Sequence, residues 1–313
     1  MKVLITGGCG YVGSKLVKSL IEKKIYIKVI DLMWFDNTLI SYKGKYLQII
    51  QKDYRKINSK DLKNIDCVIH LANVANDPSV ELNPNLSWEI NTLGMQTLCE
   101  VCVRSKIKKF IYASSGSVYG VKKERKVTED LSLEPISVYN KTKMTAERIL
   151  MSYSRELKYF IIRPATICGF SDRMRLDLTV NILTFSALKN NIINVFGGNQ
   201  LRPNIHINDM VRVYEHFLLK NLVPGIYNSG FENKKIINIA KKIQKKINCK
   251  INIKNSNDPR SYRLNSDKLL KTGFVPHYGI DHAIIELIKL HNEKKLLNKK
   301  KYYNINWLKN KVV

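Results

Sequence analysis

A glycine-rich turn near the start of the chain constrains the fold more than any other stretch. An apolar run at 1–6 leads into glycines spaced three apart, and an amphipathic stretch follows at about 11–23. This order predicts a strand, a tight turn and a helix. Gly7 lets the chain leave the strand in a tight turn, Gly10 removes a Cβ where a pyrophosphate would approach, and Gly13 lets the helix pack close to the strand.

The residues after this turn complete a dinucleotide-binding pattern. Tyr11 and Val12 open the predicted helix, whose free N–H groups and partial positive charge favour phosphates. A second strand is predicted at 25–30, and Asp31 follows it. A carboxylate there accepts hydrogen bonds from the adenosine ribose and repels a 2′-phosphate, which favours NAD over NADP. The alternative is a glycine turn in an α/β protein without a ligand.

Length and composition set the class of protein. The 313 residues, 44% of them hydrophobic, suit one large α/β domain or a domain with an added lobe. No apolar run reaches membrane-spanning length, and the opening segment lacks the layout of a signal peptide. The six cysteines are scattered, and Cys99-x-x-Cys102 has no second pair to complete a zinc site. We therefore expect a cytoplasmic protein with reduced thiols and no metal.

The formal net charge of +27 admits two interpretations. A nucleic-acid or anionic-surface partner is one, and a composition biased toward lysine is the other. The lysines are spread over the chain without interleaved aromatic residues, which favours the second interpretation and makes nucleic acid an unlikely partner. The most basic cluster, at 294–301, is expected to be poorly ordered.

The remaining pattern predicts a doubly wound parallel sheet. Strand-like runs at 46–50, 66–72, 109–113 and 159–163 alternate with helical runs at 88–106 and 137–157. After Pro164 the alternation breaks. We therefore predict a Rossmann domain at 1–165 with a return at about 204–222, and a smaller interleaved α/β lobe at 166–203 and 223–313.

A second group of residues follows the strand at 109–113. Ligands in such sheets bind beyond the carboxyl ends of the strands, where the serine-rich run at 114–120 begins. Tyr139 and Lys143 stand four apart in the next helix and share one face. A nearby ammonium favours the phenolate, so Tyr139 is a candidate base, with Ser115 holding the substrate oxygen.

These pieces together resemble the extended short-chain dehydrogenase/reductase family, which includes nucleotide-sugar epimerases and dehydratases. The matching pieces are 6–13, Asp31, Asp53, 70–72, Asn91, 114–120, Tyr139 with Lys143, 163–164 and 202–209. The resemblance implies NAD in the N-terminal domain and an NDP-sugar in the C-terminal lobe. It also implies a homodimer through the helices at 88–106 and 137–156, with which apolar residues such as Met95 and Leu98 are compatible.

The resemblance also implies roles for individual residues. Asp53 resembles the acid that meets the adenine amino group, and Asn91 the helix asparagine behind the active site. The implied cofactor-binding residues are Gly7, Gly10, Tyr11, Val12, Gly13, Asp31, Asp53, Tyr54, Leu71, Ala72, Asn91, Tyr139, Lys143 and Pro164. The implied substrate-binding residues are Ser115, Ser117, Thr166, Asn181, Arg202, Arg260 and Arg263, with either Arg260 or Arg263 at the diphosphate.

Departures from the family pattern narrow the chemistry. Gly116 and Ser117 stand where family dehydratases usually carry an acidic residue, which disfavours a 4,6-dehydratase. Thr166 stands where many members have asparagine, which puts a direct sugar contact there in doubt. The run at 173–178, with two arginines, resembles a polysaccharide-pathway subgroup that includes 4-dehydrogenases of GDP-linked heptoses.

Three functions therefore remain. The favoured one is an NAD-dependent nucleotide-sugar 4-epimerase that works through a transient 4-keto sugar. The second is a 4-dehydrogenase that releases the ketone and needs a second oxidant to regenerate NAD. The third is a basic binding or redox-sensing protein on the same scaffold, because a fold does not fix a function.

Overall fold

The main body of the computed structural model is a parallel sheet between two layers of helices. The structure describes residues 1–42, 44–256, 261 and 263–312. Within this part, a seven-stranded sheet runs in the order β10-β6-β5-β4-β1-β2-β3 with every neighbouring pair parallel. Its strands are β1 (Lys2–Thr6), β2 (Tyr26–Asp31), β3 (Leu47–Gln51), β4 (Cys67–His70), β5 (Lys109–Ala113), β6 (Lys158–Pro164) and β10 (Gly225–Ser229). The predicted doubly wound sheet is confirmed.

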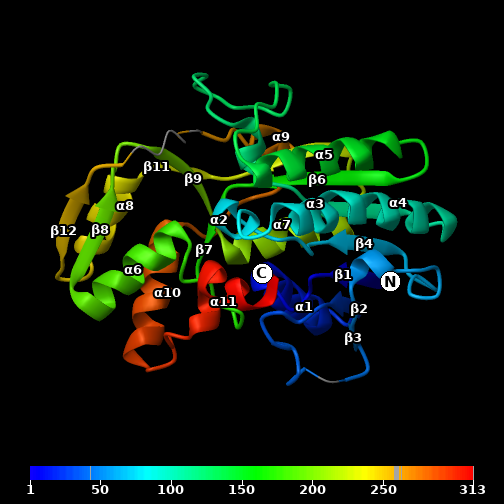
Figure 1. Cartoon of the computed structure of the whole chain (residues 1–313), viewed down its shortest axis with the longest axis horizontal. Coiled ribbons are helices and arrows are strands. Elements are labelled where there is room, and N and C mark those ends of the chain that lie inside the picture. Colours follow the sequence, from blue (N-terminus) through cyan, green and yellow to red (C-terminus); the bar gives the residue numbers. More distant parts are fainter. Residues whose placement is uncertain (43, 257–260, 262, 313) are drawn as a thin grey trace.

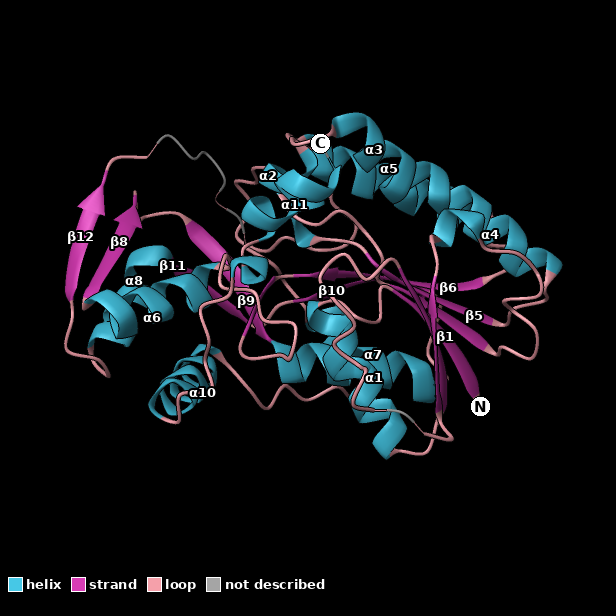
Figure 2. Cartoon of the chain, turned by 60° about the horizontal axis from the view of Figure 1, so that its bottom comes forward, coloured by secondary structure: helices cyan, strands magenta, loops and turns pink. Residues whose placement is uncertain are grey.

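Alternate strand residues bury against the two helical layers. Val3 and Ile5 belong to the core on the side of α1 (Tyr11–Glu22) and α7 (Ile207–Leu219), whereas Leu4 belongs to the core on the opposite side. That opposite layer holds α3 (Pro84–Trp88), α4 (Gly94–Arg104) and α5 (Val138–Ser152) (Figure 2). Because both faces are covered, the central strands read as continuous apolar runs.

The helix predicted at 88–106 is confirmed as a helical stretch from 84 to 104, and it contains a π-helical turn. A π-helical turn, η2 (Glu89–Leu93), separates α3 from α4. Gly94 follows it at a close approach, since a Cβ there would lie 2.5 Å from the Tyr54 hydroxyl oxygen. Met95 and Leu98 are fully buried in the chain's own core, so they are wrong as candidates for a subunit interface. The homodimer itself stays a prediction.

The smaller lobe packs beside the carboxyl ends of the main strands (Figure 1). A sheet of β7 (Thr166–Cys168), β9 (Leu201–His206) and β11 (Glu232–Lys235) links the two bodies, and β8 (Ile192–Phe196) pairs with β12 (Lys250–Lys254). Around them lie α6 (Thr179–Asn190), α8 (Ile236–Gln244) and α10 (Ile280–Asn292), whereas α9 (Asp267–Leu270) packs against β10 of the main sheet. None of the helices in the described ranges is both long and apolar enough to span a bilayer.

The predicted boundary between the two parts needs one correction. Residues 223–313 were assigned to the lobe, but β10 pairs with β6 from Gly225 to Ser229 and is an edge strand of the main sheet. The return to the main body therefore runs through α7 to the end of β10. The helical pattern in α7 was visible in the sequence, whereas a five-residue edge strand carries too short a pattern to assign to one sheet.

The C-terminal segment is packed, which corrects the expectation of a poorly ordered basic end. The short helix η4 (Lys300–Tyr302) and α11 (Asn304–Val312) follow the lysine cluster. The side chains of Tyr302, Asn304 and Leu308 are buried. These three residues anchor the segment, and the lysines around them face solvent.

Candidate cofactor site and active site

The glycine turn has the geometry that close approach of a ligand requires. Gly7 has φ +74°, and a Cβ on it would lie 2.6 Å from the Ala72 backbone nitrogen. A Cβ on Gly13 would overlap the Gly7 carbonyl oxygen. Gly10 caps α1 without any side-chain hydrogen bond. The backbone N–H groups of the first turn therefore point out of the helix with no side chain to satisfy them, which suits a phosphate group.

A cavity that is partly open to solvent lies beside this turn. Its lining includes the predicted cofactor residues Gly7, Gly10, Asp31, Asp53, Tyr54, Leu71 and Ala72. It also includes residues that sequence reasoning missed, namely Trp34 and Phe35 from the loop after β2, and Ile90 from η2. Two adjacent aromatic residues shortly after Asp31 were the available signal, but the direction in which side chains of a loop point cannot be read from the sequence.

Two carboxylates line this cavity, and their pKa values are shifted in opposite directions. Asp31 accepts hydrogen bonds from the Cys9 nitrogen at 2.9 Å and the Met33 nitrogen at 2.6 Å, while burial raises its pKa. Burial also opposes ionisation of Asp53, but the hydrogen bonds and charge of Arg55 hold the pKa of Asp53 below its ordinary value. Both fit the role of accepting hydrogen bonds from an adenosine, which supports the NAD prediction.

Asn91 lies behind the active site as expected, but its amide is engaged within the protein. Its amide accepts from the Val74 nitrogen at 2.8 Å, donates to the Val74 oxygen at 3.1 Å, and donates to Thr142 Oγ1 at 3.2 Å. With its side chain fully buried and engaged, a direct cofactor contact by Asn91 is not supported. It joins η2 to α5 behind the site instead, in line with its predicted place in the helix.

The end of β5 and the start of α5 bring the predicted catalytic residues into one region. Ser115 Oγ lies 2.7 Å from Ser117 Oγ, which donates to Asn140 Oδ1 at 2.5 Å. Lys143 Nζ lies 5.9 Å from the centre of the Tyr139 ring and donates to the Ala113 oxygen at 2.6 Å. Both serines and Tyr139 are half-buried, so they remain open to a ligand.

Lys143 is buried, and its electrostatic environment is unusual. Burial lowers the pKa of Lys143 to about 7, against an opposing attraction from Glu147. Burial and the charge of Lys143 also lower the pKa of His70 to about 3, so that imidazole is neutral. In the ligand-free protein the Lys143 ammonium therefore titrates near neutral pH, which is the range in which a tyrosine base would operate.

The buried acid behind Lys143 ties the two catalytic elements together. The Glu147 carboxylate accepts from Arg163 Nε at 3.0 Å and Nη2 at 2.6 Å, and also from the Ser114 hydroxyl. Arg163 Nη1 donates to the Tyr119 hydroxyl at 2.7 Å. This network joins the end of β5, which carries Ser115, to α5, which carries Tyr139 and Lys143.

Space beside Ser115 is closed to a larger side chain. A Cβ on Gly116 would lie 2.6 Å from Leu264 Cδ1 and 3.1 Å from the Pro164 oxygen. Pro164 thus ends β6 against Gly116, and Thr166 begins β7 half-buried two residues later.

The prediction that Asn181 binds the substrate is not supported by its contacts. Its fully buried amide accepts from the Gly169 nitrogen at 2.9 Å and donates to the Arg175 oxygen at 2.8 Å and the Tyr11 hydroxyl at 3.1 Å. It therefore supports the chain rather than a ligand. Arg202 is almost buried in β9, and its Nη1 donates to the Leu201 oxygen at 3.2 Å. Arg263 is exposed, whereas Arg260 lies outside the described residues.

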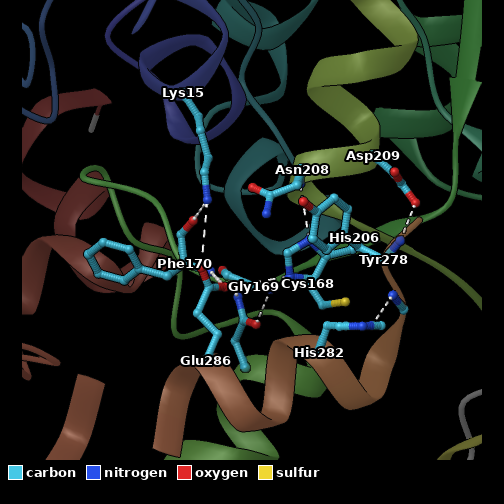
Figure 3. Close-up of polar contacts among 12 residues, drawn as sticks. Lys15, Cys168, Gly169, Phe170, His206, Asn208, Asp209, Tyr278, His282 and Glu286 are labelled. Carbon is cyan, nitrogen blue, oxygen red and sulfur yellow. Dashed lines mark hydrogen bonds and ion pairs between the residues drawn. The ribbon is translucent and has the colours of Figure 1, made fainter. Parts of the chain in front are cut away.

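The glycine-turn helix is also fastened to the lobe. Lys15 Nζ donates to the Phe170 oxygen at 2.9 Å and lies 3.7 Å from Glu286 Oε1, and Glu286 in turn accepts from the Phe170 nitrogen at 2.8 Å (Figure 3). His206 Nε2 approaches the same carboxylate at 3.5 Å. The buried Tyr11 side chain donates its hydroxyl to the Gly169 oxygen at 2.6 Å. These contacts fix the first turn of α1 relative to the lobe.

Comparisons with known proteins agree with this geometry. A model described as the NAD dependent epimerase/dehydratase family matches residues 3–230. A UDP-glucose 4-epimerase of Lactobacillus helveticus is 27% identical over 93% of this chain and 97% of its own. A dTDP-D-glucose 4,6-dehydratase of Dictyostelium discoideum is 32% identical over 76% of this chain and 62% of its own. The structure of the UDP-glucuronic acid 4-epimerase of Bacillus cereus with UDP-glucuronic acid and NAD has a TM-score of 0.84 and 25% identity, and it covers 94% of this chain and 100% of its own.

Proposed function

Because the chain belongs to the NAD dependent epimerase/dehydratase family and is an NAD-dependent enzyme of nucleotide sugars, we propose that it is a nucleotide-sugar 4-epimerase. The observation that carries the proposal is the convergence of Ser115, Tyr139 and Lys143 at the end of β5 and the start of α5, in a protein whose glycine turn borders a cavity. This set suits removal of a proton from a sugar hydroxyl as that carbon becomes a ketone.

Each of the three residues has one task in the proposed mechanism. NAD, when bound, would supply the acceptor and then the donor for a hydride at C4 of the sugar. Tyr139 takes the proton of the 4-hydroxyl and gives it back to the same oxygen when the turned 4-keto sugar is reduced at the opposite face of C4. Lys143 stabilises the phenolate by its charge, and Ser115 holds the developing carbonyl oxygen by a hydrogen bond.

The residues beside Ser115 favour epimerisation over dehydration. Loss of water across C5 and C6 needs a further acid or base near the sugar. Gly116 and Ser117 supply no carboxylate, and the Leu264 side chain leaves no room for one to be added at Gly116. A 4-dehydrogenase needs the same Ser, Tyr and Lys set and differs only in releasing the ketone. The distinction between these two lies in the fate of the reduced cofactor.

The site also indicates how the substrate is held. Arg202 is the candidate ligand for the sugar diphosphate, since a guanidinium can bind two phosphate oxygens at once. Thr166 and Ser117 are candidate contacts for the sugar hydroxyls. These assignments are part of the proposal, together with the expected location in the cytoplasm.

The first experiment identifies the nucleotide that freshly purified protein releases on denaturation, and then incubates the holoenzyme with a panel of NDP-sugars. An epimerase converts one sugar into its C4 epimer with little NADH at 340 nm. Stoichiometric NADH with a 4-keto product would overturn epimerisation in favour of the dehydrogenase. Protein that neither carries NAD nor binds added NAD would contradict the proposal of an NAD-dependent epimerase.

The Tyr139→Phe variant tests the base directly. We expect turnover to fall by about 10³-fold or more, because the proton acceptor is lost, while NAD stays bound. Tyr159→Phe is a matched control that removes a phenol hydroxyl elsewhere in the sheet. Full activity of the Tyr139→Phe variant would refute the assignment of Tyr139.

A further inference from the structure

Arg173 is a buried cation whose charge the described protein does not fully neutralise. Its side chain is 3% exposed, and its Nε and Nη1 atoms have no hydrogen-bond partner among the described residues. Burial and the neighbouring Arg175 lower the pKa of Arg173 to about 9, which shows how poorly the site is compensated. Leaving a buried guanidinium in this state is costly, unless a bound anion completes its surroundings.

The nearest carboxylates are already engaged. Asp177 accepts two hydrogen bonds of 2.9 Å from Arg175 and a third from the Asn304 nitrogen at 3.1 Å. Asp31 accepts from two backbone nitrogens in the glycine-turn region. Neither carboxylate makes a hydrogen bond to Arg173. Both carboxylates attract the guanidinium by charge, but they leave its Nε and Nη1 atoms without an acceptor among the described residues.

Contacts of the Ser171 side chain place the segment that carries Arg173 next to the first turn of α1. Ser171 Oγ donates to the Tyr11 oxygen at 2.7 Å and lies 2.9 Å from Ser14 Oγ. Arg173 follows two residues later, and its guanidinium carbon lies 3.7 Å from the centre of the Phe35 ring, which lines the cofactor cavity. The guanidinium thus packs against a residue of the cavity wall, on a segment that contacts the first turn of α1, where a helix N-terminus attracts phosphates.

The C-terminal segment 300–312 holds this arrangement from the other side. Asn304 Oδ1 accepts from Arg173 Nη2. Trp307 Nε1 donates to the Trp34 oxygen at 2.5 Å, and Lys301 forms an ion pair with Asp36. The segment therefore contacts both Arg173 and the loop that lines the cavity.

We infer that Arg173 binds the diphosphate of the dinucleotide cofactor, and that the C-terminal segment completes this site by orienting Arg173 through Asn304. Nε and Nη1 each carry an N–H group that can donate to a phosphate oxygen, and the guanidinium adds a charge to a site otherwise made of backbone N–H groups. The inference is independent of whether the reaction ends at an epimer or a ketone.

The test compares ligands that contain or lack the diphosphate, by calorimetry on protein freed of nucleotide with charcoal. In Arg173→Met we expect ADP and ADP-ribose to bind roughly 10- to 100-fold more weakly, while adenosine changes less than about twofold. UDP, which carries the diphosphate of a nucleotide sugar, should bind as in the parent. The control Arg148→Met removes the same charge from the exposed face of α5 and should leave all four affinities unchanged.

Each other outcome overturns the inference. Weaker UDP binding with unchanged ADP binding would assign Arg173 to the substrate. Equal losses for ADP and adenosine would mean that the cavity had collapsed. The melting temperature of the ligand-free protein tests for a structural role. Removal of an uncompensated buried cation should not lower this temperature. A lower melting temperature of Arg173→Met with an unchanged affinity for ADP would make Arg173 purely structural.

Asn304→Leu tests the positioning role. It should weaken ADP several-fold while Arg173 is present and have no further effect in the Arg173→Met background, since it acts through Arg173. Equal effects in both backgrounds would show that Asn304 does not act through that residue.

Discussion

The buried pair of Glu147 and Arg163 predicts a large loss of stability when only one partner is changed. Both side chains are almost fully buried, and the carboxylate accepts from Arg163 Nε and Nη2 and from the Ser114 hydroxyl. Glu147→Gln keeps the shape but removes the charge, and it turns one acceptor into a donor that faces other donors. Breaking such a pair from one side costs about 3–5 kcal/mol. That is a large fraction of the roughly 5–15 kcal/mol that stabilises a folded domain.

Equilibrium unfolding in urea, followed by circular dichroism and tryptophan fluorescence, measures this loss. We expect a lower midpoint at unchanged slope, with both probes coincident. The exposed Glu156→Gln change just after α5 is the matched control and should stay within about 0.5 kcal/mol. The double variant Glu147→Leu with Arg163→Met should be more stable than Glu147→Gln, because no buried charge is left alone. A loss below about 1 kcal/mol in Glu147→Gln, or purely additive effects in the double variant, would refute the reasoning.

Three further changes test the cofactor site. Gly13→Ala forces a Cβ into the Gly7 oxygen and should lower both NAD affinity and melting temperature, by about 1–3 kcal/mol of overpacking, whereas Gly44→Ala, with no atom within 4 Å of its added Cβ, should lower neither. Asp31→Asn removes the charge that repels a 2′-phosphate, so the preference for NAD over NADP in equilibrium binding should shrink roughly tenfold; an unchanged preference would contradict the ribose role. Lys143, with a pKa of about 7, is charged below neutral pH and then repels the cationic nicotinamide of NAD. The affinity for NADH relative to that for NAD should therefore rise as the pH falls from 8 to 6. Lys143→Met should abolish that trend.

The sequence allowed correct predictions where a short pattern determines the local structure. Glycine spacing predicts the turn and the start of α1 because only a residue without a Cβ fits against Ala72 and Gly8. The four-residue spacing of Tyr139 and Lys143 fixes a shared helix face whatever the rest of the chain does. These local rules carried most of the fold and the core of the candidate site.

Contacts between distant segments could not be predicted in this way. Trp307 meets Trp34 across the length of the chain, and no periodicity links the two positions. Asn181 has chemistry suited to a phosphate, but its burial beside Tyr11 and Gly169 depends on how the lobe packs against α1. The role of Arg173 likewise follows from what its neighbours already bind, which only the folded arrangement reveals.

The order of strands in the main sheet has a consequence for how the chain is made. β10 pairs with β6 but leaves the ribosome only after the whole of α6, β8 and α7. Until then the outer edge of β6 offers unpaired backbone groups, in a run as apolar as Phe160-Ile161-Ile162. Such an edge pairs readily with a second nascent chain. Overproduction should therefore be limited by aggregation during synthesis, and slower translation before residue 229 should worsen it.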